Sequence, residues 1–242
     1  VFGSNRHPCP CRCERERQAK LDQELREINH RHRIAELRRS CFSYPAMYFW
    51  TFANASIQTE RLEQCRRYAE NWSTVYDQNA GLLFWGDVGT GKTYLAACIA
   101  NALIEQEIPV RMTNLAAVIN HGFEDREAYI HRLCSCSLLI LDDLGMERDT
   151  KFGLETIYDV IDGRYLSGKP LIVTTNLTLR EMRKETDLDK RRIYDRVLTM
   201  TTPLFFGREN LRNAGKNQKM ALMKELIAEP ERRDYENGHH LV

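Results

Sequence analysis

The 242-residue sequence has no long hydrophobic run and almost no net charge. No stretch approaches the ~18 consecutive apolar residues of a membrane-spanning helix, and no apolar signal segment stands near the N-terminus. The formal net charge of +1 favours no class of partner by itself. We also find no internal repeat, so a repeat architecture is not expected.

Hydrophobic residues make up 43% of the chain, enough to fill the core of one α/β domain with an appendage. Scattered cysteines suit a reducing compartment, so the sequence predicts a cytoplasmic protein. The scattered cysteines are Cys41, Cys65, Cys98, Cys134 and Cys136. Charge is uneven along the chain: residues 180–219 carry eleven basic and six acidic side chains. Such a stretch is either a solvated face or the place where arginines and nucleic-acid contacts gather.

The chain divides by composition into three parts. Residues 1–53 form a predicted arm: a short Cys/Pro-rich segment, a charged amphipathic helix over 14–39 suited to docking on a partner, and a linker. Residues 54–229 form the predicted core, and residues 230–242 a disordered tail. Within the core, expected helices (59–78, 94–103, 115–123, 127–134, 150–166 and 214–227) alternate with expected strands (82–85, 110–113, 138–141, 170–175 and 204–206). This alternation predicts an α/β fold, a parallel sheet covered by helices on both faces.

A glycine-rich loop between the first strand and its helix fits the pattern G-x-x-x-x-G-K-[ST]. Its backbone N–H groups and the helix start favour phosphate, Lys92 reaches the β- and γ-phosphates, and the Thr93 hydroxyl ligates Mg²⁺. A chance match would lack the flanking strand and helix, so the sequence predicts binding of a nucleoside triphosphate. The predicted binding residues are Gly86, Asp87, Val88, Gly89, Thr90, Gly91, Lys92, Thr93 and Tyr94.

Two acids follow an apolar strand and begin 50 residues after Lys92. Asp142 is placed to hold the Mg²⁺ shell, and Asp143 to orient or deprotonate an attacking water. The alternative is a solvated turn. Asn176 ends another apolar strand, where its amide would lie between the γ-phosphate and the water, although an Asn there can also start a turn.

Arginines after this strand are candidates for stabilising the transferring phosphoryl group. Arg192 and Arg196 lie on a helix, from which a guanidinium would reach a neighbouring subunit's nucleotide; the alternative is a salt-bridged surface helix. Arg212 follows the last strand, where it would act in its own chain.

The ordered motifs GDVGTGKT, LLILDDLG, VTTN, RIYDRV and GRENLR resemble those of the bacterial replicative-helicase loaders of the DnaC/DnaI type, AAA+ ATPases related to the IstB transposase helper. The resemblance covers roughly residues 54–227. It implies an AAA+ fold, sensor 1 at Asn176, a trans arginine finger at Arg196 with Arg192 as the alternative, and sensor 2 at Arg212. One departure is Asp143, where many AAA+ proteins carry Glu, and this leaves brisk turnover in doubt.

The N-terminal segment holds four side chains that suit tetrahedral Zn²⁺: His7, Cys9, Cys11 and Cys13. It resembles the end of the zinc-binding module of DnaI-type loaders but lacks that module's upstream Cys pair. The segment is therefore either a zinc site or a remnant with free thiols.

These features together predict an ATP- and Mg²⁺-dependent ATPase that assembles on single-stranded DNA and helps to place a replicative helicase. The alternatives are a transposase helper of the IstB type and a nucleotide-gated adaptor with negligible hydrolysis. The expected partners are a replicative helicase, single-stranded DNA and further copies of the chain.

Overall fold

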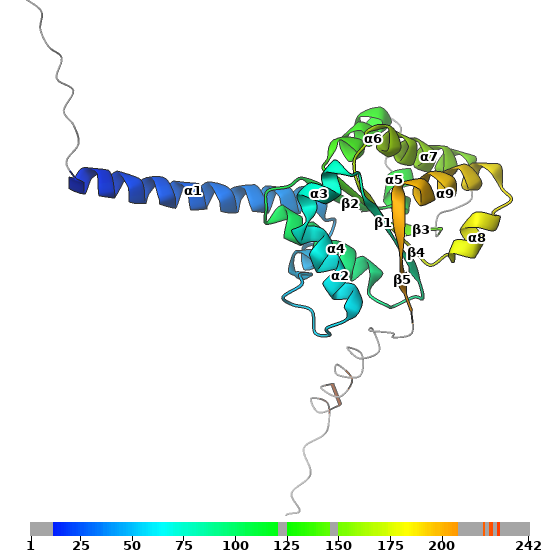
Figure 1. The fold of residues 1–242 in the computed structure, drawn as a ribbon, viewed down its shortest axis with the longest axis horizontal. Helices are drawn as coiled ribbons and strands as arrows, with labels where there is room; N and C mark the ends of the chain where they lie inside the picture. Colours follow the sequence, from blue (N-terminus) through cyan, green and yellow to red (C-terminus); the bar gives the residue numbers. More distant parts are fainter. Residues whose placement is uncertain are drawn as a thin grey trace, which may run out of the picture.

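The computed structural model describes residues 12–120, 125–145, 150–207, 220, 223–224 and 227. In this part of the chain, five parallel strands form one sheet in the order β2-β3-β4-β1-β5 (Figure 1). The strands are β1 Gly81–Gly86, β2 Val110–Asn114, β3 Leu138–Leu144, β4 Leu171–Thr175 and β5 Thr201–Phe206. The predicted α/β class and parallel sheet are confirmed.

Helices cover both faces of the sheet (Figure 1). One face is covered by α2 Glu60–Glu70, α3 Trp72–Asp77 and α4 Lys92–Ile104, after α1 Arg12–Cys41 and the short 3-10 helix η1 Pro45–Phe49. The other face is covered by α5 Leu115–Asn120, α6 Arg126–Ser135, α7 Lys151–Leu166, α8 Leu179–Lys184 and α9 Leu188–Met200.

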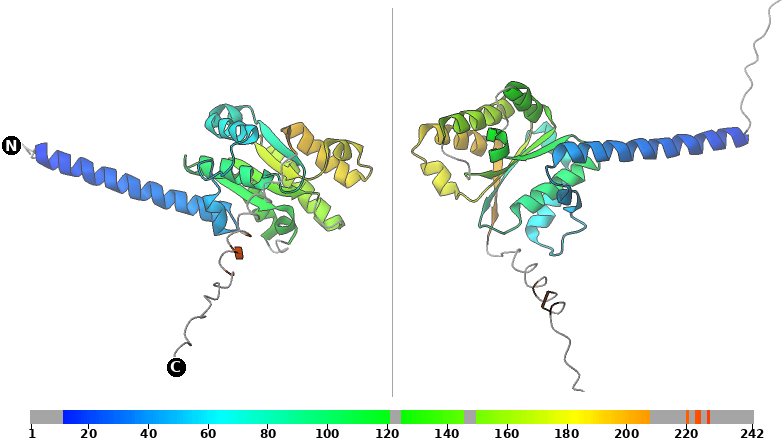
Figure 2. Two further views of the ribbon diagram at one scale, coloured as in Figure 1. Left: turned by 90° about the horizontal axis from the view of Figure 1, so that it is seen from below. Right: turned by 180° about the vertical axis from the view of Figure 1, so that it is seen from behind.

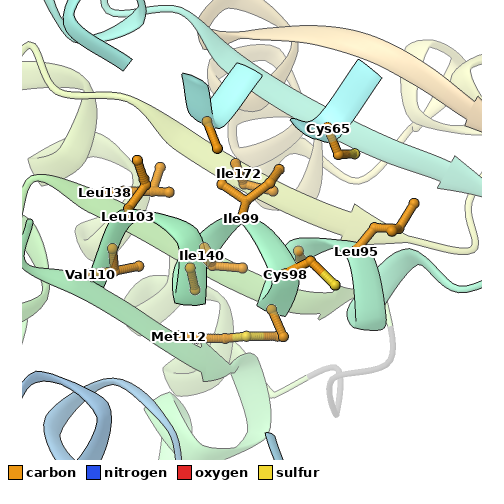
Figure 3. Close-up of a cluster of buried hydrophobic side chains, with 14 of the residues drawn as sticks. Cys65, Leu95, Cys98, Ile99, Leu103, Val110, Met112, Leu138, Ile140 and Ile172 are labelled. Atoms are coloured by element: carbon orange, nitrogen blue, oxygen red, sulfur yellow. The ribbon is translucent and has the colours of Figure 1, made fainter. Parts of the chain in front are cut away.

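The two faces of the strands fill two separate cores, because successive side chains of a strand point in opposite directions. On β3, Leu138 and Ile140 pack under α4, whereas Leu139 and Leu141 pack under α7 and α9. Figure 3 shows the first cluster, where side chains of α4 meet those of β2, β3 and β4. Burial on both faces explains why these strands are nearly continuous apolar runs.

Helix α1 has two apolar stripes on opposite sides. Its last turns bury Ile34, Leu37 and Cys41 against the first core. Further toward the N-terminus, where the helix projects from the body (Figure 2), Leu21, Leu25 and Ile28 are 47%, 52% and 42% exposed. At 3.6 residues per turn, the two stripes point about 180° apart. Contacts with the core therefore leave the outer stripe uncovered.

The linker after α1 also packs on the core. Phe42, Met47 and Phe52 are buried, and the Asn101 amide of α4 donates to the carbonyls of Met47 and Trp50 at 2.9 Å each. The division of the chain at residue 53 stays a prediction, and these contacts extend the packed body back to Ile34.

The structure differs from the sequence expectations at several places. The single helix expected over 59–78 is two helices, because Asn71 leaves helical geometry and its amide caps the Arg67 carbonyl. β5 starts at Thr201 instead of 204, and it includes Pro203, which an edge strand tolerates. Helix α8 was not expected, although Thr178 and Glu181 form a capping box at its start.

A buried arginine connects the amino-terminal ends of β3 and β4. The Arg164 guanidinium is fully buried and donates five hydrogen bonds of 2.6–3.1 Å, all to backbone carbonyls. The acceptors belong to Cys134, Cys136, Ser137 and Pro170. Burial lowers the pKa of Arg164 from its ordinary value. These bonds hold α6, the loop before β3 and the loop before β4 together.

The predicted terminal helix (214–227) falls almost entirely outside the described residues, and the predicted tail (230–242) lies wholly outside them. Among the helices that the structure describes, none combines the length and the apolar character needed to cross a membrane.

Candidate nucleotide-binding site

The loop from Gly86 to Gly91 joins β1 to the first turn of α4, which begins with Lys92, Thr93 and Tyr94. Gly86 has φ +127°, and a Cβ there would lie 2.1 Å from the Phe206 carbonyl oxygen, so only glycine fits beside β5. Gly91 caps α4 in the left-handed conformation, with φ +90°. The sequence pattern therefore has the strand–turn–helix setting that a phosphate-binding loop requires.

The Lys92 ammonium lies at the centre of the site, although the side chain is only 6% exposed. Its Nζ donates to the carbonyls of Gly86 and Asp87 at 2.9 and 2.7 Å and to Asn176 Oδ1 at 2.9 Å. The last contact spans 84 residues of sequence. It arises because β4 lies between β1 and β3, so the end of β4 reaches the loop after β1.

Asp142 faces the start of α4. Its Oδ1 accepts hydrogen bonds from the Thr93 hydroxyl at 3.0 Å and from the Thr174 hydroxyl at 2.6 Å. Burial raises the pKa of Asp142 above its ordinary value, while both hydroxyl donors and the nearby Lys92 oppose this shift. The adjacent oxygens of Thr93 and Asp142 are the hard ligands that Mg²⁺ prefers, so these two residues fit the ion.

Asp143 and Asn176 lie at the carboxyl edge of the sheet, where ligands of open α/β sheets collect. Asp143 is exposed and has a left-handed backbone, with φ +62°. Asn176 directly follows β4, which pairs with both β1 and β3. The site thus joins one cation at the start of α4, two acids of β3 and one amide after β4.

Sequence reasoning passed over Thr174. The signal was its position in the same VTTN segment, two residues before Asn176.

The two candidate finger arginines contact α7 of their own chain. Arg196 Nε donates to Asp162 Oδ1 at 3.1 Å, and its guanidinium lies 4.3 Å from the Tyr165 ring centroid. Arg192 stacks on Tyr158 at 4.5 Å. Neither geometry selects one arginine as the finger. Arg212 lies outside the described residues.

Of the predicted zinc ligands, His7, Cys9 and Cys11 lie outside the described residues, and Cys13 is exposed in the first turn of α1. Within the part of the chain that the structure describes, no group of three or more His, Cys, Asp or Glu side chains is arranged to hold a metal. The zinc site stays a prediction.

Comparison with known proteins places this chain in a family. The model of the family described as IstB-like ATP binding protein matches residues 16–218. The replicative helicase loader DnaC of Escherichia coli is 28% identical over 199 residues, which cover 75% of this chain and 74% of DnaC. The protein YdaV of the same organism is 29% identical over 196 residues, covering 77% and 73% of the two chains.

Among solved structures, the crystal structure of DnaI superposes with a TM-score of 0.58 at 21% identity, covering 70% of this chain and 94% of DnaI. At that identity the likeness shows the fold alone. Since the family model spans most of the sequence, the chain belongs to the family of IstB-like ATP-binding proteins and has the AAA+ fold seen in the DnaC/DnaI type of helicase loader.

Proposed function

We propose that this protein is an ATP-dependent helicase loader: it binds ATP with Mg²⁺, hydrolyses it, assembles on single-stranded DNA and helps to place a replicative helicase. Two side-chain contacts at one edge of the sheet support the ATPase part of this proposal. Lys92 donates to Asn176, and Thr93 donates to Asp142. The loading part rests on the relatives named replicative helicase loader DnaC. The cytoplasm is the proposed compartment.

Each residue of the site has a chemical role in this proposal. Lys92 binds the β- and γ-phosphates, and its bond to Asn176 is exchanged for phosphate contacts when ATP enters. Thr93 and Asp142 hold Mg²⁺, which when bound neutralises charge on the phosphates. Asp143 orients or deprotonates the attacking water, and the released Asn176 amide lies between that water and the γ-phosphate.

The arginine finger is proposed to come from a neighbouring subunit. Arg196→Ala subunits keep an intact nucleotide site, and Lys92→Ala subunits keep an intact finger. Mixing the two should therefore restore part of the ATP hydrolysis that each lacks alone. Measured turnover in mixtures at several ratios checks this. The finger is Arg192 if Lys92→Ala subunits recover no hydrolysis when mixed with Arg196→Ala subunits but do recover it when mixed with Arg192→Ala subunits.

The outer stripe of α1 is proposed to dock on the helicase. Leu25 is 52% exposed on the projecting part of the helix, on the side away from the core. Leu25→Glu should weaken helicase association about tenfold or more, because burial of one leucine contributes about 1.5–3 kcal/mol. ATP binding should not change, since Ile34, Leu37 and Cys41 still anchor the helix.

Co-purification of the 242-residue chain with a replicative helicase tests both the stripe and the loading function. Gln23→Glu is the matched control, because it adds the same charge at an exposed position outside the stripe. Equal helicase retention by wild type, Leu25→Glu and Gln23→Glu would remove the stripe from the interface. Failure of the wild type to retain any helicase would contradict the loading function itself.

Two other functions remain candidates. The match to the IstB-like family favours a transposase helper, which would retain a transposase in the same experiment. Asp143 in place of Glu favours an adaptor that binds ATP and scarcely hydrolyses it.

Single-stranded DNA is proposed to contact the basic stretch 180–219, and that binding should weaken with salt as counterions are released.

A further inference from the structure

The strand that carries the two acids contains a bulge beside Thr174. Leu141 pairs with Val173 and Leu144 pairs with Thr175, so Asp142 and Asp143 together face the single residue Thr174. A bulge leaves its extra residue outside the ladder of strand hydrogen bonds and changes the direction of the local side chains. Here it lies where the proposed magnesium ligand and the proposed catalytic acid stand side by side.

The Thr174 hydroxyl binds to both acidic residues at once. It donates to Asp142 Oδ1 at 2.6 Å and accepts the backbone N–H of Asp143 at 2.9 Å. Thr174 is fully buried, so its hydroxyl is fixed by these partners instead of exchanging with water. One hydroxyl thus fixes both the position of the Asp142 carboxylate and the backbone conformation of Asp143.

The backbone of Asp143 needs such support. Its φ of +62° lies in the left-handed region, which is uncommon for residues other than glycine, although Asp tolerates it better than most. The bulge removes its N–H from the strand ladder, and an unpaired N–H at a partly buried site is costly. The Thr174 hydroxyl supplies the missing acceptor and so stabilises the conformation from which the Asp143 side chain projects.

We propose that Thr174 is a positioning residue for the acidic pair. Through its hydroxyl it holds the Asp142 carboxylate beside Thr93 and fixes the bulged backbone that presents Asp143. This inference rests on the proposed ATPase function and deepens it.

The test is a Mg²⁺ titration of nucleotide binding by Thr174→Val, which keeps the shape of the side chain and removes the hydroxyl. Binding of a fluorescent ATP analogue in EDTA should stay within about twofold of wild type. The Mg²⁺ concentration that gives half of the metal-dependent tightening should rise about 10- to 100-fold, the usual cost of losing a residue that orients a metal ligand. For hydrolysis, kcat should fall while KM at saturating Mg²⁺ changes little.

Two further variants separate positioning from packing. Thr174→Ser retains the hydroxyl and should restore the wild-type Mg²⁺ requirement. Thr156→Val removes another buried hydroxyl, which donates to the Phe152 carbonyl within α7, and should leave the titration unchanged. If the valine variant fails to fold in a thermal melt, Thr174→Ala is titrated in its place.

A wild-type Mg²⁺ requirement in a folded Thr174→Val or Thr174→Ala protein would overturn the inference. The same holds if Thr174→Ser shifts as far as Thr174→Val, or if Thr156→Val shifts equally. A wild-type protein that binds nucleotide in a Mg²⁺-dependent way but never hydrolyses it contradicts the proposed ATPase activity instead, and the titration then still decides the role of Thr174.

Discussion

Replacing Lys92 by alanine should lower the affinity for ATP about 100-fold or more. Its buried ammonium sits in the loop that faces the expected β- and γ-phosphates, and each hydrogen bond to a charged group contributes about 1.5–3 kcal/mol. Loss of two such bonds to phosphate would cost about 3–6 kcal/mol, which corresponds to a factor of about 100 or more in affinity. Titration with a labelled ATP analogue measures the change.

Lys151→Ala is the control, because Lys151 is an exposed lysine at the start of α7. It should bind the analogue like the wild type. A thermal melt accompanies both titrations, since Lys92 also satisfies the carbonyls of Gly86 and Asp87. Equal affinities of the wild type and a folded Lys92→Ala protein would refute the assignment of this loop as the nucleotide site.

Replacing Arg164 by methionine should lower the free energy of unfolding by about 3–5 kcal/mol, because several hydrogen bonds from a charged donor to buried carbonyls are lost at once. Methionine fills much of the space but cannot donate, so the carbonyls of Cys134, Cys136, Ser137 and Pro170 lose their partner. Buried acceptors without donors each cost about 1–3 kcal/mol. Urea-induced unfolding followed by circular dichroism measures the loss.

Arg180→Met provides the comparison, because Arg180 is exposed on α8 and its loss should change the unfolding free energy by less than about 0.5 kcal/mol. The bonds of Arg164 lie at the opposite ends of β3 and β4 from Asp142 and Asn176. Arg164→Met that remains folded at low temperature should therefore bind ATP normally. An Arg164→Met protein as stable as the wild type would mean that these carbonyls find other donors.

The candidate nucleotide site could be recognised from the sequence because its parts are local. The glycine spacing, the lysine and the threonine of residues 86–93 form one continuous segment, whose backbone geometry depends on its own residues and on the strand and helix around it. The apolar runs that end in Asp142 and Asn176 indicate buried parallel strands for the same reason.

Contacts between distant segments could not be predicted in this way. The bond between Lys92 and Asn176 depends on β4 lying between β1 and β3, and strand order follows from how the crossover helices pack. The Thr174 contacts depend on a one-residue bulge, and the alternation of apolar and polar residues does not predict a bulge. The burial of Arg164 likewise depends on carbonyls of α6 and of two loops, which only the folded chain brings together.

By itself, then, the sequence determined the chemistry that this protein carries: a phosphate loop, an acidic pair and an amide at strand ends, on an alternating α/β core. Only the tertiary structure decided which of these groups touch, which hydroxyl orients the acids and which arginine is buried. The physical reason is that backbone conformation is set mainly by neighbours in the chain, whereas side-chain partners are set by packing across the sheet.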